Sequence, residues 1–329
     1  MPAKLEVVLV GASGATGVSI INTLLKEPEI FPSLAPALST NQSGFDLAKR
    51  GIRVLAVDLL GPENDLFTAL KGTQVVISTI FPLGTHQEQI NLVNASHKAG
   101  VSRIVPGCWG PVVPPAGVLT MREEKEQIIN HIKKIKLPYT IIDVGNWYQT
   151  NLPRVPSGKL DYMITEQMRY LSSEVDAKVA MSDIRDIGKQ VAKIIVDERT
   201  LNKYVLAFSE ILTQRELLDV VRKCTGEEPL VKEVTNAEVE NLLSDAKDVS
   251  MSDPTNIVKA VQLAVLEYFY SWAIRGDTSI ENAKYLGYLD TKELYGENPN
   301  LTSFNAFVDE IIQGKGVMLQ TDYVNVHKQ

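Results

Sequence analysis

Apolar and polar positions follow a repeating strand–helix pattern over the first half of the chain. Short apolar runs rich in valine and isoleucine are typical of strands buried on both faces of a parallel sheet. The segments between them carry apolar residues at helical spacing. The pattern predicts strands at residues 5–10, 34–38, 53–57, 75–80, 103–105 and 139–144, and helices at 18–26, 64–71, 86–99 and 123–134. This alternation predicts an α/β fold with a doubly wound parallel sheet.

A glycine loop lies between the first predicted strand and the first predicted helix, with the sequence Gly11-Ala12-Ser13-Gly14-Ala15-Thr16-Gly17. Gly11 permits a sharp turn, Gly14 lets the backbone approach a pyrophosphate, and Gly17 lets the helix pack closely. Unpaired N–H groups of the first helical turn can then bind phosphate. A tight turn without a ligand is the alternative, but the strand before the loop and the helix after it favour a nicotinamide dinucleotide site.

Polar residues follow two other predicted strands at the expected ligand-binding edge. Asp58 ends the third strand, where a carboxylate can accept a hydrogen bond from an adenine amino group. Ser78 and Thr79 end the fourth strand, beside the expected cofactor groove. Each of these residues alone also suits an ordinary loop. Together with the glycine loop they favour nucleotide binding.

The strand–helix alternation ends after residue 146, and residues 152–158 are punctuated by proline and glycine. The remainder mixes predicted helices at 186–196, 214–223 and 255–273 with short strands such as 204–208. We therefore expect an NAD(P)-binding Rossmann domain at residues 1–152. Residues 153–329 are expected to form mainly a smaller α+β substrate domain, with part of 180–210 returning to the Rossmann sheet.

Composition narrows the class of protein further. The chain has 329 residues, of which 44% are hydrophobic, and a net charge of −7 with acids and bases interspersed. No apolar run reaches the roughly 18–20 residues of a transmembrane helix. The cysteines are Cys108 and Cys224, which predicts a reducing, cytoplasmic location without a disulfide framework.

We expect a small-molecule partner and neither a nucleic acid nor a membrane, and a homodimer stays open. His86, His97 and His131 lack metal-ligand spacing, so no metal site is expected.

One lysine interrupts the apolar face of the predicted helix at 123–134. That face comprises Met121, Ile128, Ile129, Ile132 and Ile135. Lys125 lies within it, whereas Arg122, Glu126 and Lys133 fall outside it. Desolvation on such a face would lower the pKa of Lys125 and suit it to proton transfer. The alternative is a lysine whose stem covers apolar surface while its ammonium reaches water. The helical pattern alone does not separate these two interpretations.

Aromatic residues follow the fifth and sixth predicted strands, where a substrate would lie. Trp109, Trp147 and Tyr148 are therefore candidate substrate contacts, although a hydrophobic core between domains explains them equally well. The Tyr-x-x-x-Lys pair of typical short-chain dehydrogenases occurs at Tyr288 and Lys292. We interpret that match as chance, because it lies in the second predicted domain and away from any predicted sheet edge.

Several stretches together resemble the isoflavone reductase and phenylcoumaran benzylic ether reductase group of NmrA-like atypical short-chain dehydrogenases. Lys125 stands thirteen residues before Pro138, a spacing found in that group. The other matching stretches are residues 11–17, 71–79, 101–110, 123–125, 186–188, 199–203 and 275–277. The resemblance implies an NADPH-binding Rossmann domain, a smaller substrate domain and a cleft between them. It also implies that Lys125 is the general acid/base and that Asn146 matches an asparagine common in the family.

The chain departs from this group at three places. Where the family usually has an arginine for the adenosine 2′-phosphate, this chain has Ser39 and Thr40, and Lys49 could assist them. These residues still predict NADP(H) in preference to NAD(H), by a smaller margin. The family arginine four residues after the lysine is Ile129, and the family serine–glutamate near the fifth strand is the pair at 107–108.

The sequence thus predicts an NADPH-dependent reductase of an aromatic, polyketide-like or alkaloid-like small molecule of secondary metabolism, with Lys125 as general acid/base. One alternative is a non-redox isomerase or cyclase on the same NADP-binding scaffold. Another is an NADP-binding redox sensor without turnover, which the presence of Lys125 disfavours.

Overall fold

The computed structural model describes residues 4–38, 55–81, 84–164, 168–253 and 255–318. Within them a five-stranded parallel sheet has the order β3-β2-β1-β4-β5. Its strands are β1 (Glu6–Val10), β2 (Ser33–Leu38), β3 (Leu55–Ala56), β4 (Val75–Ser78) and β5 (Arg103–Val105). The chain builds outward from β1 in one direction and then in the other, so the strand order reverses between β1 and β4. This topology confirms the predicted doubly wound α/β fold.

The sheet extends beyond β5 through strands from distant parts of the chain. A bridge joins Ile104 to Tyr139, just before β6 (Thr140–Asp143). Parallel pairing then continues to β10 (Lys203–Leu206) and to β13 (Tyr288–Asp290). The interpretation that Tyr288 lies away from any sheet edge was therefore wrong, because Tyr288 begins the last strand of this extension.

A buried arginine holds this extension together. The Arg103 guanidinium donates to the Thr140 and Thr200 hydroxyls and to the carbonyl oxygens of Ile194 and Asp197. Burial lowers the pKa of Arg103. Since a buried cation is costly unless its donors are satisfied, these four acceptors fix β5, β6 and the turn before β10 relative to one another.

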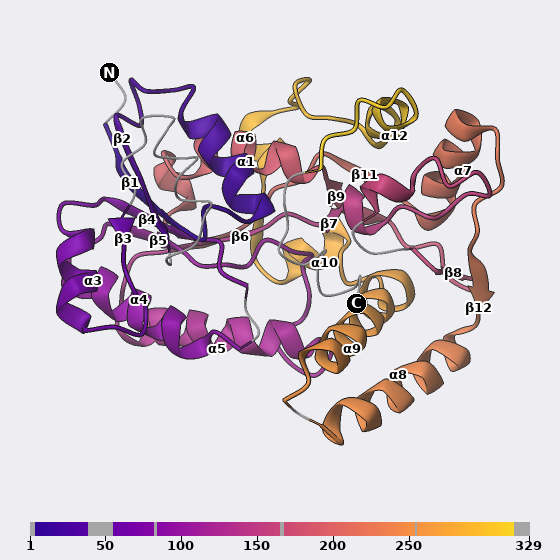
Figure 1. The fold of residues 1–329 in the computed structure, drawn as a ribbon, viewed down its shortest axis with the longest axis horizontal. Helices are drawn as coiled ribbons and strands as arrows, with labels where there is room; N and C mark the ends of the chain where they lie inside the picture. The colour runs from indigo at the N-terminus through magenta and orange to yellow at the C-terminus, as the bar shows by residue number, and fades with distance from the viewer. Residues whose placement is uncertain (1–3, 39–54, 82–83, 165–167, 254, 319–329) are drawn as a thin grey trace.

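Helices cover both faces of the sheet (Figure 1). One layer contains α1 (Ala15–Leu24) and α6 (Ile187–Ile194), and the other contains α3 (Glu63–Leu70), α4 (His86–Lys98) and α5 (Thr120–Lys134). Each layer buries its own apolar cluster against the sheet. The observed α5 begins three residues before the predicted start, because a carboxylate from a distant helix accepts hydrogen bonds at its first turn.

The second half of the chain builds a separate apolar cluster around Tyr148, Leu217, Trp272, Phe304 and Phe307. Its strands are β7 (Asn146–Trp147), β8 (Tyr170–Ser172), β9 (Val179–Ser182), β11 (Glu210–Leu212) and β12 (Lys232–Val234). Its helices are α7 (Gln214–Thr225), α8 (Asn236–Met251), α9 (Ile257–Phe269), α10 (Ile280–Tyr285), α11 (Thr291–Tyr295) and α12 (Phe304–Ile312), with a π-helix at Tyr270–Arg275 and short 3₁₀ helices at Tyr148–Thr150, Asp161–Met163, Ile184–Asp186 and Glu198–Thr200. A domain boundary near residue 152 stays a prediction.

One described helix is long and apolar enough, by length and composition alone, to cross a membrane. It spans Ile257–Arg275 and comprises α9 and the π-helix. Its residues Leu263, Phe269 and Trp272 are buried within the protein. The apolar side of this helix therefore packs against the protein core. α9 lies beside α8 (Figure 1).

Glycine allows α1 and α6 to approach each other closely. A Cβ on Gly188 would lie 2.2 Å from the Ser19 carbonyl oxygen and 2.6 Å from the Thr23 hydroxyl. The Gly188 N–H donates to the Ser19 hydroxyl, which in turn donates to the Arg185 carbonyl oxygen. This contact holds α1, the helix that follows the glycine loop, against α6.

We expect Gly188→Ala to lower the free energy of unfolding by about 1–3 kcal/mol, because the added methyl meets backbone atoms that cannot move aside cheaply. Urea denaturation followed by circular dichroism measures the change. Lys193→Ala, on the exposed side of the same helix, is the control and should stay within about 0.5 kcal/mol. Equal effects of the two substitutions would contradict the close contact.

Candidate active site

Two glycines of the loop are required by its backbone geometry. Gly11 has a φ of +80°, and a Cβ there would lie 2.8 Å from the Thr79 hydroxyl. That hydroxyl donates to the carbonyl oxygens of Val10 and Gly11, at 3.0 and 2.7 Å. A Cβ on Gly17 would lie 2.5 Å from the Gly11 carbonyl oxygen. Thr79 therefore ties the end of β4 to the loop, and the loop folds back on the first turn of α1.

Gly14 differs because its side-chain position is open. Gly14 is the N-cap of α1 with φ −70° and ψ 162°, a conformation that other residues adopt. Among the described residues, a Cβ there would have only the Gly11 carbonyl oxygen within 4 Å, at 3.5 Å. No side chain from the described part of the chain caps the N-terminus of α1, so the N–H groups of its first turn are available to an anion. The loop therefore fits a dinucleotide pyrophosphate, and Ala12, Ser13, Ala15 and Thr16 supply its remaining backbone.

Among the other proposed cofactor residues, Ser78, Asp58 and Asn146 lie in the described part of the chain. Ser78 is buried at the end of β4, and its carbonyl oxygen accepts from the Trp109 indole at 2.7 Å. Asp58 is exposed, and its carboxylate accepts from the Leu60 N–H at 2.9 Å in the turn before α3. Asn146 is buried in β7. Ser39, Thr40 and Lys49 lie outside the described residues.

Lys125 lies on α5 and points to the loop after β5. Its Nζ donates to the carbonyl oxygen of Cys108. Burial lowers the pKa of Lys125, and the positive charge of Arg122 acts in the same direction, while Cys108 and Asp143 partly oppose the shift. The ammonium is thus held by a backbone carbonyl at the carboxyl edge of the sheet. This geometry supports proton transfer over a lysine that only covers apolar surface.

Trp109 is part of the core and not a substrate contact, which corrects one prediction. Its side chain is 6% exposed and packs with the cluster between the sheet and α1. Its φ of +29° is unusual for a residue with a side chain. The turn made there at the end of β5 places the Cys108 carbonyl toward Lys125 while the indole reaches the Ser78 carbonyl.

Tyr148 is also an interior residue, which corrects a second prediction. Its side chain is fully buried among Phe304 and Phe307, and its hydroxyl donates to the Glu210 carboxylate at 2.6 Å. A substrate cannot reach it. Trp147 is only partly buried, and its indole N–H is buried without a hydrogen-bond partner in the described residues. Trp147 therefore stays a candidate substrate contact.

The structure reveals a buried ion pair that the helical pattern did not predict. Arg122 is 3% exposed, and its guanidinium contacts the carboxylates of Asp143 and Glu126, each at 2.8 Å. It also donates to the Tyr288 hydroxyl at 3.0 Å, and that hydroxyl donates to Asp143. Arg122 was predicted to lie outside the buried face of α5. The prediction failed because a carboxylate at the end of β6 lies opposite this arginine.

This network also explains the Tyr-x-x-x-Lys match. Burial, followed by the Asp143 carboxylate, raises the pKa of Tyr288, which therefore stays protonated. The Lys292 ammonium pairs with the Glu297 carboxylate at 2.9 Å. The two residues do not form the proton-transfer pair of typical short-chain dehydrogenases, and the interpretation of the match as chance agrees with these contacts.

A second unpredicted contact joins α5 to α9. The Glu267 carboxylate, on a side chain that is 2% exposed, accepts from the Thr120 backbone N–H at 2.8 Å and from its hydroxyl at 2.9 Å. A carboxylate at a helix N-terminus accepts hydrogen bonds from free N–H groups and interacts favourably with the helix dipole. Because Glu267 comes from the distant second half of the chain, no local sequence signal could reveal it.

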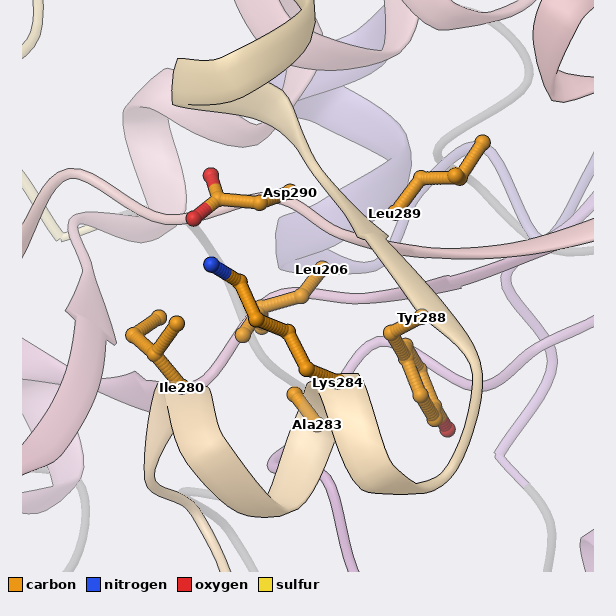
Figure 2. A pocket seen from close by; sticks show the side chains of 7 residues that line it. All are labelled: Leu206, Ile280, Ala283, Lys284, Tyr288, Leu289 and Asp290. Carbon is orange, nitrogen blue, oxygen red and sulfur yellow. The ribbon is translucent and has the colours of Figure 1, made fainter.

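Figure 2 shows a hollow elsewhere on the molecule, lined by residues of α10, β10 and β13. Its ionic groups already have partners, since the Lys284 ammonium contacts the Glu293 carboxylate at 2.5 Å and the Asp290 carboxylate accepts from the Lys292 backbone N–H. In Figure 2 the Tyr288 hydroxyl points away from Lys284 and Asp290. The hollow is therefore separate from the chemistry around Lys125. The described residues also contain no cluster of histidine, cysteine and carboxylate side chains that could hold a metal ion.

Comparison with known proteins agrees with this architecture. A model of the NmrA-like family matches residues 3–272. The chain is 37% identical over 316 residues to an asnovolin J 5′,6′-dehydrogenase of Aspergillus novofumigatus, covering 94% of this chain and 96% of that protein. It is 28% identical to pinoresinol reductase 1 of Arabidopsis thaliana, covering 77% of this chain and 84% of that protein. A solved complex of Vitis vinifera leucoanthocyanidin reductase with NADPH has the same fold, with a TM-score of 0.75 at 20% identity over 94% of this chain and 99% of that one.

The sheet order and the glycine loop define a Rossmann-like α/β protein. The chain belongs to the NmrA-like family. The resemblance to the isoflavone reductase group is thereby confirmed, with an isoflavone reductase-like protein of Olea europaea among its relatives.

We expect Arg122→Met to lower the free energy of unfolding by about 3–5 kcal/mol, because it leaves the buried Asp143 carboxylate without its cation. Chemical denaturation measures the loss. Arg154→Met is the matched control, since Arg154 is 54% exposed and its ion pair with the Asp161 carboxylate is longer, at 3.6 Å. That control should change stability by less than about 1 kcal/mol. Similar losses in both variants would show that burial of the Arg122–Asp143 pair is not what stabilises this region.

Proposed function

We propose that this protein is an NADP(H)-dependent oxidoreductase that acts on an aromatic or polyketide-like small molecule, with Lys125 as general acid and base. One observation carries the proposal: the glycine loop and the carbonyl that holds Lys125 both lie at the carboxyl edge of one parallel sheet. The loop follows β1, Thr79 follows β4, and the Cys108 carbonyl that holds Lys125 follows β5. Ligands of doubly wound sheets bind at this edge, where the strand order reverses.

The residues divide the chemistry between binding and proton transfer. A bound nicotinamide dinucleotide supplies or accepts the hydride. The first turn of α1 would hold the pyrophosphate, with Gly14 leaving room for it. In the reductive direction the Lys125 ammonium donates a proton to the substrate, and in the oxidative direction its neutral amine accepts one. Burial lowers the pKa of Lys125, which makes its neutral amine easier to form than that of an exposed lysine.

The relatives support both the redox chemistry and the substrate class. Asnovolin J 5′,6′-dehydrogenase and pinoresinol reductase are each named for a redox reaction on one small molecule. One name describes oxidation and the other reduction, and a lysine side chain can transfer a proton in either direction. The substrate of this protein is therefore proposed as a secondary metabolite, and the relatives favour an oxidoreductase over a non-redox isomerase or cyclase and over a sensor.

The cofactor preference and the cellular location are finer parts of the proposal, and each rests on a few residues. The preference for NADP(H) over NAD(H) depends on Ser39, Thr40 and Lys49, which are known here from sequence alone. The proposed cytoplasmic location is consistent with the free thiols of Cys108 and Cys224. A homodimer stays a prediction.

We expect Gly14→Val to weaken NADPH binding at least tenfold, because its side chain would project into the open space in front of α1. Isothermal calorimetry measures the affinity. Thermal unfolding without cofactor should stay close to that of the wild type, since the Gly14 backbone conformation suits other residues. Undiminished NADPH affinity in the folded variant would contradict the cofactor assignment.

We expect Lys125→Met to lower turnover roughly a hundred- to ten-thousandfold, because the apolar stem remains and only the proton-transfer group is lost. NADPH absorbance during reaction with a panel of aromatic ketones, enones and lactones measures turnover. In the wild type, kcat/KM for reduction should fall as pH rises through the Lys125 pKa, below the ordinary lysine value of 10.5. This limb of the profile should vanish in the variant.

Product formation without NADPH consumption would instead indicate the isomerase or cyclase. Tight NADPH binding with no conversion of any substrate would indicate the sensor. Wild-type rates in Lys125→Met with NADPH bound would end the catalytic assignment of Lys125.

A further inference from the structure

Polar atoms from three parts of the chain converge beside Gly110, directly after the turn at Trp109. A Cβ built on Gly110 would lie 3.7 Å from the Lys125 Nζ and 3.6 Å from the Tyr268 hydroxyl oxygen. The same point lies 3.4 Å from the Cys108 carbonyl oxygen. Gly110 does not need a positive φ, so its backbone conformation does not require glycine. A methyl group would fit at this point, and the Lys125 ammonium and the Tyr268 hydroxyl both lie next to it.

The Tyr268 hydroxyl has a weak partner in this position. Within the described residues it donates to the thioether sulfur of Met121 at 3.4 Å, and a thioether is a weak acceptor. Burial raises the pKa of Tyr268, with the Asp143 carboxylate acting in the same direction. The hydroxyl therefore stays protonated and can donate to a stronger acceptor. As whole residues, Tyr268 and Lys125 are only partly buried, whereas Gly110 is buried.

The relative position of these groups is fixed by the contact between α5 and α9. Glu267, the neighbour of Tyr268, accepts both hydrogen bonds at Thr120 on the first turn of α5. Arg122, two residues further along α5, pairs with Asp143. The charged groups around Lys125 and Tyr268 are thus Glu267 on α9, Arg122 on α5 and Asp143 on β6. The hydroxyl and the ammonium are thus presented to one point by a rigid scaffold.

We propose that Tyr268 is a second catalytic residue, which donates a hydrogen bond to the substrate oxygen that exchanges its proton with Lys125. The substrate class is then an aromatic molecule with a carbonyl, enol or phenol oxygen. This inference rests on the proposed function. In reduction, the carbon takes the hydride from the dinucleotide, the oxygen takes the proton from the Lys125 ammonium, and water returns a proton to the amine. Tyr268 keeps its own proton throughout and stabilises the negative charge on the oxygen.

A binding experiment with p-nitrophenol tests the proposal without turnover. The phenolate form absorbs visible light, so titration reports both its affinity and the pKa of the bound phenol. In the wild type, bound p-nitrophenol should have a pKa below its value in water, because a cation and a donor both favour the phenolate. Tyr268→Phe should weaken phenolate binding roughly ten- to a hundredfold and raise the bound pKa, as expected for loss of a hydrogen bond to a charged oxygen.

Gly110→Ala is a second variant, because its methyl would occupy the shared point while making only contacts of 3.4 Å or longer. It should weaken phenolate binding to a similar degree. Tyr285→Phe is the matched control, since Tyr285 is 86% exposed, and it should bind as the wild type does. Absence of phenolate binding by the wild type, or equal binding by wild type, Tyr268→Phe and Gly110→Ala, would overturn the proposal.

The two proposals fail in distinguishable ways. If the wild type binds p-nitrophenolate through Tyr268 but does not bind NADPH, the oxyanion site stands and the proposed oxidoreductase function is wrong. If NADPH binds and Lys125→Met lowers turnover while Tyr268→Phe changes neither phenolate affinity nor the bound pKa, the function stands and Tyr268 has no catalytic role.

Discussion

The buried pair of Arg122 and Asp143 constrains the region where the proposed chemistry occurs. Removing two charges from water is costly, and the cost is offset only when each finds its partner in good geometry. Arg122 contacts Asp143, Glu126 and Tyr288 together, and these contacts allow α5 only a narrow range of rotation about its axis. Because Lys125 lies one helical turn along, that rotation also directs its ammonium to the Cys108 carbonyl. The arginine thus sets the orientation of the lysine and, as a nearby positive charge, also helps to lower its pKa.

The ion pair holds α5 against the sheet, while the Glu267 carboxylate holds the start of α5 against α9. These contacts act at neighbouring positions of one helix and reach partners far apart in the sequence. Their effect is to place a residue from the second half of the chain next to a loop of the Rossmann-like sheet. The proposed proton-transfer site is therefore complete only when both halves of the chain are folded together.

Features encoded locally could be predicted from the sequence, whereas features that depend on distant partners could not. The valine-rich strand, the glycine loop and the helical face containing Lys125 each follow from spacing within a few residues. Arg122 was placed on the wrong side of α5 because helical angle says nothing of the Asp143 carboxylate opposite it. Tyr148 was predicted near a substrate because it follows a strand, but Phe304 and Phe307 from the far end of the chain enclose it. Tyr268 had no local signal, since one tyrosine on an apolar helix is ordinary.

Four of the described glycines illustrate two different physical reasons for the absence of a side chain. Gly11 and Gly145 have positive φ values and would place a Cβ against backbone atoms. Their substitution would strain the chain itself. Gly14 and Gly110 adopt backbone conformations open to other residues, and their Cβ positions make no contact shorter than 3.4 Å. The backbone does not require glycine at these two positions, and in each case a side chain would stand in front of polar groups. At Gly14 that space faces the free N–H groups of α1, and at Gly110 it faces Lys125 and Tyr268. Both spaces open at the carboxyl edge of the same sheet, where the cofactor and the substrate of a doubly wound protein meet.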